Sequence, residues 1–225
     1  MRKVLVVSRT KMRNGVCVGG IDLTSGLFVR LHTEHGANLS CDAPYNIGEI
    51  WDLELESPWN PRKAPHVEDV MVKSANRLEV VPSERLTCYI KGLGIPIYCG
   101  PLESIFEGKV SFTSRGKGYI NESNVPCNSV CFWIPDADLL PNESSGKINF
   151  VYKDKQIPYV GFQKVNIIPA GTLVRMSLAN WWKPDDDTDV EPRCYVQLSG
   201  WYNIHFLKSH IRNLFVFIHK INFTR

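Results

Sequence analysis

The sequence has no long hydrophobic run and little net charge. No apolar stretch among its 225 residues approaches the roughly 20 residues of a membrane-spanning helix, and the N-terminus has neither the apolar core nor the cleavage site of a signal peptide. The net charge is only +3, so no global field selects a polyanionic partner, and any basic surface must be local. These absences predict a cytoplasmic protein without a membrane partner.

The patterns of several common catalytic and metal sites are also missing. Strands do not alternate with long amphipathic helices, which argues against a parallel nucleotide-binding sheet. The loop SRGKG at 114–118 lacks the Gly-Lys-Ser/Thr ending of a P-loop. The seven cysteines are scattered, and Cys127 and Cys131 do not have the spacing of a zinc knuckle. We therefore expect no metal and no cofactor, and favour a binding protein over an enzyme.

Short β-strands separated by turns fill most of the sequence. Runs rich in β-branched and aromatic residues are bounded by Gly, Pro, Asn or Asp, as in hairpins. Five runs lie in the first half, in about 75 residues, which is the size of a small closed barrel: RKVLVVS, GVCVGGI, LFVRLH, EIWDLELE and HVEDVMVKS. The second half contains VSFTS, GYINES, SVCFWIPD, INFVY, QIPYVGFQ, TLVRMSLANWW and CYVQLSGWY, with SRGKG, PNESSG and PDDDTD as loops. This pattern predicts an all-β protein, with two small β-barrels in tandem and short helical connectors.

The segment between the two halves differs from both. Residues 76–93, NRLEVVPSERLTCYIKGL, are the best candidate for a short helix, with Ser83 as its N-cap. A boundary here divides the chain into an N-terminal barrel, 1–84, and a C-terminal barrel, 85–203. The remaining residues, 204–225, form a basic and apolar tail in which large aliphatic residues recur at helical spacing. This tail is predicted either to close a barrel as a helix or to lie outside the domain.

Cations without neighbouring acids mark the first hairpin. The first twenty residues contain five basic residues and no acid. Arg9, Lys11 and Arg13 occupy every second position of the stretch VVSRTKMRNGVCVGGI, so their side chains point the same way if the chain is extended. A solvated face or a protected sheet edge explains this pattern as well as a phosphate-binding face does.

Aromatic residues accompany cations in three other stretches. They are FVRL with Arg30, SRGKGY with Arg115, Lys117 and Tyr119, and LVRMSLANWWKP with Arg175, Trp181, Trp182 and Lys183. Proteins that bind single-stranded nucleic acid combine a cationic groove with aromatic faces on which bases stack. Adjacent strand residues face opposite sides, so at most one of the two neighbouring indoles is expected to be free to stack. Arg30 and Arg175, flanked by apolar residues, are alternatively buried ion-pair partners.

Several of these strings resemble the dual OB-containing domain family. The matching segments are VLVVSRTKMRNGVCVGGIDL, FVRL, IGEIWDLEL and APHVEDV in the first half, and CFWIPD, YVGFQ, GTLVRMSLANWWKP and CYVQLSGWY in the second. They cover residues 1–202 in the family's order, with Cys131 in place of an expected glycine. The resemblance implies two tandem OB-like barrels and a bacterial source, and it carries over no activity. Its motifs nominate Ser8, Arg9, Lys11, Arg30, Arg175, Trp181, Trp182 and Lys183.

Two binding functions are compatible with these residues, beside a third possibility of a protein-interaction adaptor or an enzyme whose mechanism the sequence does not show. The first is a non-enzymatic module that binds single-stranded or structured DNA or RNA in a basic groove with stacking aromatics. Its candidate residues are Ser8, Arg9, Lys11, Arg13, Arg30, Arg115, Lys117, Tyr119, Arg175, Trp182 and Lys183. The second is a sensor or adaptor that holds a nucleotide or small ligand between the two barrels, with Arg9, Arg30 and Arg175 directed inward. The first hypothesis predicts that the cations gather on one concave surface.

Overall fold

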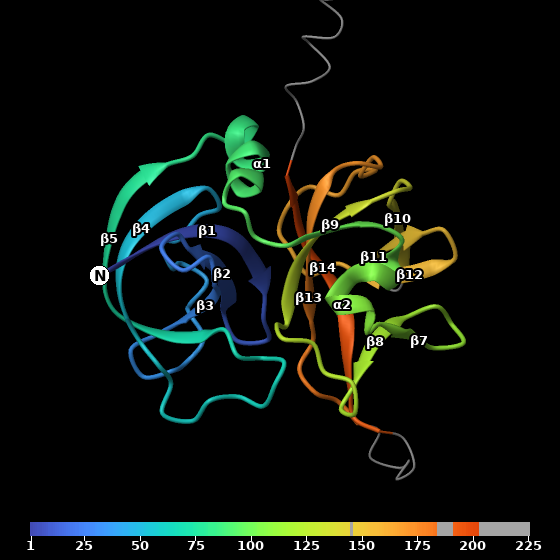
Figure 1. Ribbon diagram of the computed structural model, residues 1–225, viewed down its shortest axis with the longest axis horizontal. Coiled ribbons are helices and arrows are strands. Elements are labelled where there is room, and N and C mark those ends of the chain that lie inside the picture. The colour runs from blue at the N-terminus through green and yellow to red at the C-terminus, as the bar shows by residue number, and fades with distance from the viewer. Residues whose placement is uncertain (145, 184–190, 203–225) are drawn as a thin grey trace, which may run out of the picture.

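Two β-barrel units lie side by side in the chain (Figure 1). The computed structural model describes residues 1–144, 146–183 and 191–202. The whole of the acidic loop PDDDTD at 184–189 and the whole predicted tail at 204–225 therefore lie outside the described residues. Within the described residues, no helix is long and apolar enough to cross a membrane.

The first unit is a closed barrel of five strands. They are β1 (Arg2–Lys11), β2 (Val16–Asp22), β3 (Phe28–His32), β4 (Glu49–Glu56) and β5 (Asp69–Val80). Each of the five strands predicted in this half is confirmed. The barrel closes in the order β1-β2-β3-β5-β4, with β3 and β5 parallel and the other pairs antiparallel.

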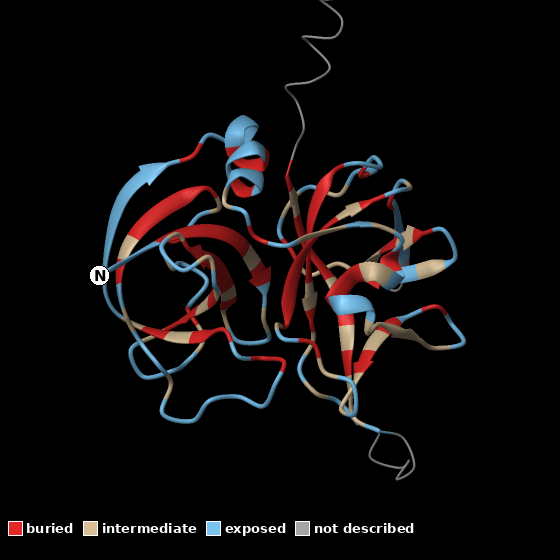
Figure 2. Cartoon of the chain, viewed as in Figure 1, coloured by how far each residue is buried: buried red, intermediate tan, exposed pale blue. Residues whose placement is uncertain are grey.

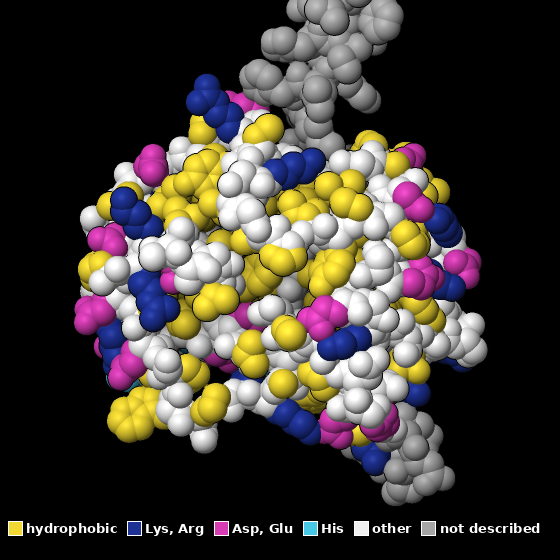
Figure 3. All heavy atoms as spheres, in the orientation of Figure 1, with side chains coloured by type: hydrophobic (Ala, Val, Ile, Leu, Met, Phe, Trp, Pro, Cys, Tyr) yellow, Lys and Arg dark blue, Asp and Glu magenta, His cyan; other side chains and the backbone are white. Residues whose placement is uncertain are grey.

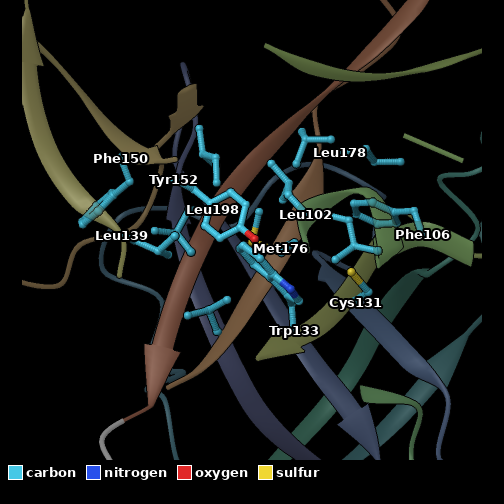
Figure 4. Packing of buried hydrophobic residues seen from close by; sticks show 14 of the residues in the cluster. Leu102, Phe106, Cys131, Trp133, Leu139, Phe150, Tyr152, Met176, Leu178 and Leu198 are labelled. Atoms are coloured by element: carbon cyan, nitrogen blue, oxygen red, sulfur yellow. The ribbon is translucent and has the colours of Figure 1, made fainter. Parts of the chain in front are cut away.

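The second unit contains the remaining strands and short helices. They are β6 (Ile97–Gly100), η1 (Leu102–Ser104), α2 (Ile105–Gly108), β7 (Ser111–Phe112), β8 (Gly118–Asn121), β9 (Val130–Pro135), β10 (Leu140–Ser144), β11 (Lys147–Tyr152), β12 (Lys155–Pro158), β13 (Leu173–Leu178) and β14 (Arg193–Tyr202). Six strands form a curled sheet in the order β6-β9-β13-β14-β8-β7, and β10, β11 and β12 form a three-stranded sheet. Trp133, Tyr152 and Met176 pack in the core of this second unit (Figure 4).

The connectivity of the first barrel recurs in the second unit. β13 pairs with both β9 and β14, just as β4 pairs with both β1 and β5. β9 and β10 together take the place of β1, and β11 and β12 follow β10 in a meander as β2 and β3 follow β1. A bridge between Tyr159 and Leu198 runs parallel beside β14, as β3 does beside β5. This strand order is that of the Greek-key OB barrel. The predicted all-β fold with two tandem OB-like barrels is therefore confirmed.

The connector between the units differs from its prediction. Residues up to Val80 extend β5, and the helix α1 covers only Ser83–Gly92. Pro82, not Ser83, occupies the N-cap position, and no side chain caps the helix. The boundary predicted at residue 84 thus falls inside α1. The loop predicted from PNESSG is also wrong in part, because Pro141–Ser144 belong to β10, where pairing with β11 overrides the local turn preference.

The two units share one hydrophobic cluster. Leu5 and Val7 of β1 pack with α1 and with Phe132, Leu173 and Tyr202 of the second unit. The alternate residues of β1, by contrast, pack only with the first barrel. Both faces of this strand are therefore buried, which explains why its sequence is a continuous apolar run instead of an alternating one. Figure 2 shows the buried strands where the units meet.

Candidate ligand-binding site between the barrels

A loop of the first barrel ties the two units together. Residues 57–68, which connect β4 to β5 and which we call the strap, bind the second unit at five points. These are Arg62 Nη1 to Asn180 Oδ1 at 3.0 Å, Lys63 to Glu122, the Ala64 carbonyl to Trp181 Nε1 at 3.0 Å, His66 Nε2 to the Ala179 carbonyl at 3.1 Å, and Glu68 Oε2 to Ser129 Oγ at 2.8 Å. The strap therefore fixes the second unit over one face of the first barrel.

A cavity of about 270 Å³ lies between the units beside the strap. The first barrel contributes β2, β3, the turn after β1 and the strap, and the second unit contributes chiefly β13 and the residues that follow it. The second and third strands, together with the loops after the first and fourth strands, are where OB barrels bind their ligands. The second unit thus covers the usual binding face of the first barrel and leaves a partly open space there.

Arg175 of β13 is the most deeply buried cation of this cavity. Its exposed fraction is 5%, and its Nη1 donates a hydrogen bond to Ser199 Oγ at 3.0 Å. Nε has no hydrogen-bond partner among the described residues, and no described carboxylate lies within ion-pair distance of the guanidinium. An unpaired buried charge is costly, so a site that retains one is suited to an anion supplied from outside.

Arg30 of β3 forms an ion pair, which is the alternative that its apolar neighbours in the sequence left open. Its Nε binds Asp69, which is also 3.0 Å from Arg62 Nε and 3.0 Å from His32 Nε2. Burial raises the pKa of Asp69, but hydrogen bonds from His32 and Arg30 outweigh it and lower the pKa to about 2. Arg30 Nη2 is buried and has no hydrogen-bond partner in the described part of the chain. Asp69 therefore holds Arg30 in place and leaves one of its donors unused.

The lining of the cavity is positive overall. Five cations contribute to it: Lys11, Arg13, Arg30, Arg62 and Arg175. Among the described residues, the single lining carboxylate is that of Glu68, whose oxygens accept hydrogen bonds from the backbone and hydroxyl of Ser129. The rest of the lining consists mainly of aliphatic residues, of Ser and Thr, and of Asn and Gln. It contains no Phe, Tyr or Trp from the described residues. The cavity can accept an anion, but it offers no aromatic ring for stacking.

Comparison of the sequence with protein families agrees with the OB strand order of the two units. The family model of the dual OB-containing domain matches residues 2–201. The chain belongs to this dual OB family. The resemblance inferred from the motifs is thereby confirmed. No curated protein and no solved structure matches the chain in these comparisons.

The dual OB fold divides the predicted site residues into groups. Four of them line the cavity, namely Lys11, Arg13, Arg30 and Arg175. Ser8 is buried beside it, with its hydroxyl close to Gly19. Arg115 and Lys117 are exposed in the β7–β8 hairpin, outside the cavity. On the face shown in Figure 3, Lys and Arg are scattered among acidic and hydrophobic side chains, so they form no single positive field there.

Arg9 is engaged away from the cavity. Its guanidinium donates to the carbonyl oxygens of Cys41, Ala43 and Tyr45. β1 ends at Lys11, so Arg13 lies in the turn, and the three cations do not share the extended face that their spacing suggested. Arg9 therefore anchors the loop before β4. Its role is structural, and it does not point into the cavity between the barrels.

The two neighbouring tryptophans have the predicted division of roles. Trp181 packs against the core of the second unit and donates to the strap, whereas 52% of Trp182 is exposed. Trp182, Tyr119 and the exposed Lys183 lie on the second unit and do not line the cavity. The site residues missed from the sequence include Arg62 and Gln197, which line the cavity, and Asp69, which pairs with Arg30. Of these, only Gln197 had a usable signal, the alternation along RCYVQLSGWY.

Proposed function

We propose that this dual OB protein is a binding module for a small phosphate-bearing ligand of the nucleotide class, held in the cavity between the barrels. The observation that carries the proposal is the pair of buried guanidinium donors, Arg175 Nε and Arg30 Nη2, that have no protein partner in the described residues. They come from different barrels and both line the same cavity. An anion placed there would lie beside guanidinium groups of both units and be attracted by their charge.

Phosphate suits this arrangement better than an anion with a single ionised oxygen does. Charge-assisted hydrogen bonds from arginine to phosphate are short and often bidentate, and they are about twice as strong as neutral ones. Arg13 and Lys11 also line the cavity, and because both residues are exposed they supply further positive charge that is open to solvent. A ligand with more than one ionised oxygen can therefore use both the buried and the exposed cations.

The size and position of the cavity favour a small ligand over a long polymer at this face. Its volume of about 270 Å³ lies near the lower end of the usual range for small-molecule sites, about 300–1,000 Å³. The strap and β13 cover the face along which an OB barrel usually holds an extended strand. These features favour the second of the two functions predicted from the sequence.

Thermal unfolding with and without ligand tests the proposal. A ligand at about 100 times its Kd stabilises the folded state by about 2.7 kcal/mol, which raises the Tm of a chain of this size by roughly 5–10 °C. We expect this rise with nucleoside monophosphates, a smaller rise with inorganic phosphate, and none with the unphosphorylated nucleosides.

Two arginine variants provide the matched comparison. Arg175→Met removes the buried cation and is expected to abolish the rise in Tm. Arg115→Ala removes an exposed hairpin arginine outside the cavity and is expected to preserve it. The proposal is wrong if no phosphorylated ligand raises the Tm, or if Arg175→Met responds as the unaltered protein does.

A further inference from the structure

A row of aromatic rings crosses the outer face of the second unit. Tyr119 of β8 and Tyr195 of β14 are directly paired residues whose ring centroids are 6.1 Å apart. The Trp182 ring follows at 6.0 Å from Tyr195, and the Arg193 guanidinium carbon lies 4.3 Å from the centroid of Tyr119. We call Tyr119, Tyr195, Trp182 and Arg193 the ring row. Trp182 is half exposed, so at least one of its faces is accessible.

The ring row and the cavity lie on the same face of one sheet. Along β14, Cys194, Val196 and Leu198 point into the core of the second unit. Because side chains alternate along a strand, Arg193, Tyr195 and Gln197 point to the opposite face. Gln197 and its partner Ser177 on β13 line the cavity. Tyr195 is the next outward residue, so the ring row begins about 7 Å along the strand from the cavity wall.

The two sites are complementary in chemistry. Within the described part of the chain the cavity has cations and no aromatic ring, whereas the ring row has three aromatic rings and one arginine. Arg193 Nε is buried without a hydrogen-bond partner, and no ion pair is formed by Arg193 or by the nearby Lys117 within the described residues. A ligand that joins a phosphate to successive planar bases would match both parts.

We infer that the cavity and the ring row together bind one end of a single-stranded nucleic acid, with its terminal phosphate in the cavity and the following bases on the ring row. This inference rests on the proposed function of the cavity. The exposed Trp182 ring lies beyond the partly buried Tyr195 as seen from the cavity, so a base further along the strand can stack there. Lys117 lies two residues before Tyr119 and contributes positive charge for the phosphates between the bases.

Fluorescence anisotropy with labelled oligonucleotides of about six nucleotides tests the inference at constant salt. The oligonucleotides carry a 5′-phosphate, a 3′-phosphate or no terminal phosphate, as DNA and as RNA, with the label at the opposite end. We expect one terminal phosphate to raise the affinity at least about tenfold, because it alone reaches the buried arginines. Equal affinity with and without either terminal phosphate would overturn the inference.

Two tryptophan variants separate the ring row from the cavity. Trp182→Ala should weaken oligonucleotide binding by about 5- to 150-fold, the usual effect of removing one stacking ring. Trp59→Ala, which alters an exposed tryptophan of the strap outside the ring row, should leave it unchanged. Neither variant should alter the Tm rise caused by inorganic phosphate. An unchanged affinity in Trp182→Ala, or an equal loss in both variants, would contradict the inference.

The inference and the proposed function can fail separately. A Tm rise with mononucleotides but no binding of oligonucleotides overturns the inference and leaves the proposed function standing. Oligonucleotide binding that is insensitive to both a terminal phosphate and Arg175→Met overturns the inference, because the cavity then has no part in oligonucleotide recognition. The proposed function is overturned as well only if mononucleotides also fail to raise the Tm. Loss of oligonucleotide binding in Arg175→Met and in Trp182→Ala, each with an intact fold by circular dichroism, supports both.

Discussion

Arg175 of the second unit lies directly against Gly19 of the first barrel. A Cβ atom at Gly19 would be 2.6 Å from Arg175 Nη2 and 2.5 Å from Ser8 Oγ, closer than real Cβ contacts allow. The glycine on β2 is therefore what permits the guanidinium to reach its position between the barrels. The cation and the glycine come from different units, so the site depends on both.

Gly19→Ala should consequently displace Arg175 and weaken ligand binding. Overpacking at such a contact costs about 1–3 kcal/mol, so we expect a lower Tm together with a smaller rise on addition of nucleotide. Gly92→Ala is the matched control, because a Cβ at Gly92 meets no atom within 4 Å. Thermal unfolding with and without nucleotide measures both effects. An unchanged nucleotide response in Gly19→Ala would show that Arg175 does not need this space.

The two buried arginines should respond in opposite ways to replacement by methionine. Arg175 has no carboxylate partner in the described structure, so Arg175→Met removes an uncompensated charge and should leave the unliganded stability unchanged or raise it. Arg30→Met takes a partner from buried Asp69 and should cost about 1–3 kcal/mol. Urea unfolding without ligand measures both values. Equal destabilisation by the two variants would contradict this account of Arg175.

His66 of the strap should make stability fall at mildly acidic pH. Burial, followed by the nearby charges of Arg30 and Arg62, lowers its pKa from 6.5 to about 4. Between these values the unfolded chain takes up a proton that the folded protein does not, so stability is complete above about pH 6.5 and falls by about 3 kcal/mol on going down to about pH 4. Asp69, with its pKa lowered from 3.8 to about 2, loses its contribution only below this window.

Urea unfolding across this pH range checks the assignment to His66. His66→Gln should flatten the pH dependence whatever its effect on stability at neutral pH. His35→Gln, which removes an exposed histidine paired with Glu34, should preserve the slope. A slope that persists in His66→Gln would assign the titration to another group.

The shared hydrophobic cluster should make the two barrels unfold together. Phe132 of β9 is fully buried, and its ring centroid is 5.8 Å from both Phe28 of the first barrel and Tyr202 of β14. Phe132→Ala should cost about 3–5 kcal/mol and preserve a single unfolding transition. Phe162→Ala, at a half-exposed position, should change stability by less than about 0.5 kcal/mol. Calorimetry that resolves two transitions in Phe132→Ala would show that the barrels are energetically independent.

The strands of the first barrel follow from local sequence, whereas the site depends on how the barrels meet. The apolar run of β1 is sufficient to predict a strand, because β-branched residues suit a pleated surface whatever lies opposite. The hydrogen bonds of Arg9 to the loop before β4 could not be predicted in the same way. It has the same spacing as Lys11, and only the fold of the loop 41–45 decides that carbonyl oxygens meet its guanidinium.

Asp69 and Arg62 show the same limit. Asp69 lies in an ordinary strand pattern, and Arg62 lies in a loop without regular structure. Neither position carries a local signal, because their roles arise from β3 and from the second unit, which are distant in sequence. Tyr195 and Gln197 differ, since the alternation along β14 already places them together on one face.

The strap and β13 wall off a face that other OB barrels leave open to a passing polymer. A covalently closed circle of single-stranded DNA has no terminal phosphate to place in such a cavity, however many nucleotides it contains. Under the inferred mode of binding, one cut in that circle creates the terminal phosphate that the cavity would hold. That mode makes the number of strand ends, and not the length of the strand, the quantity that governs binding.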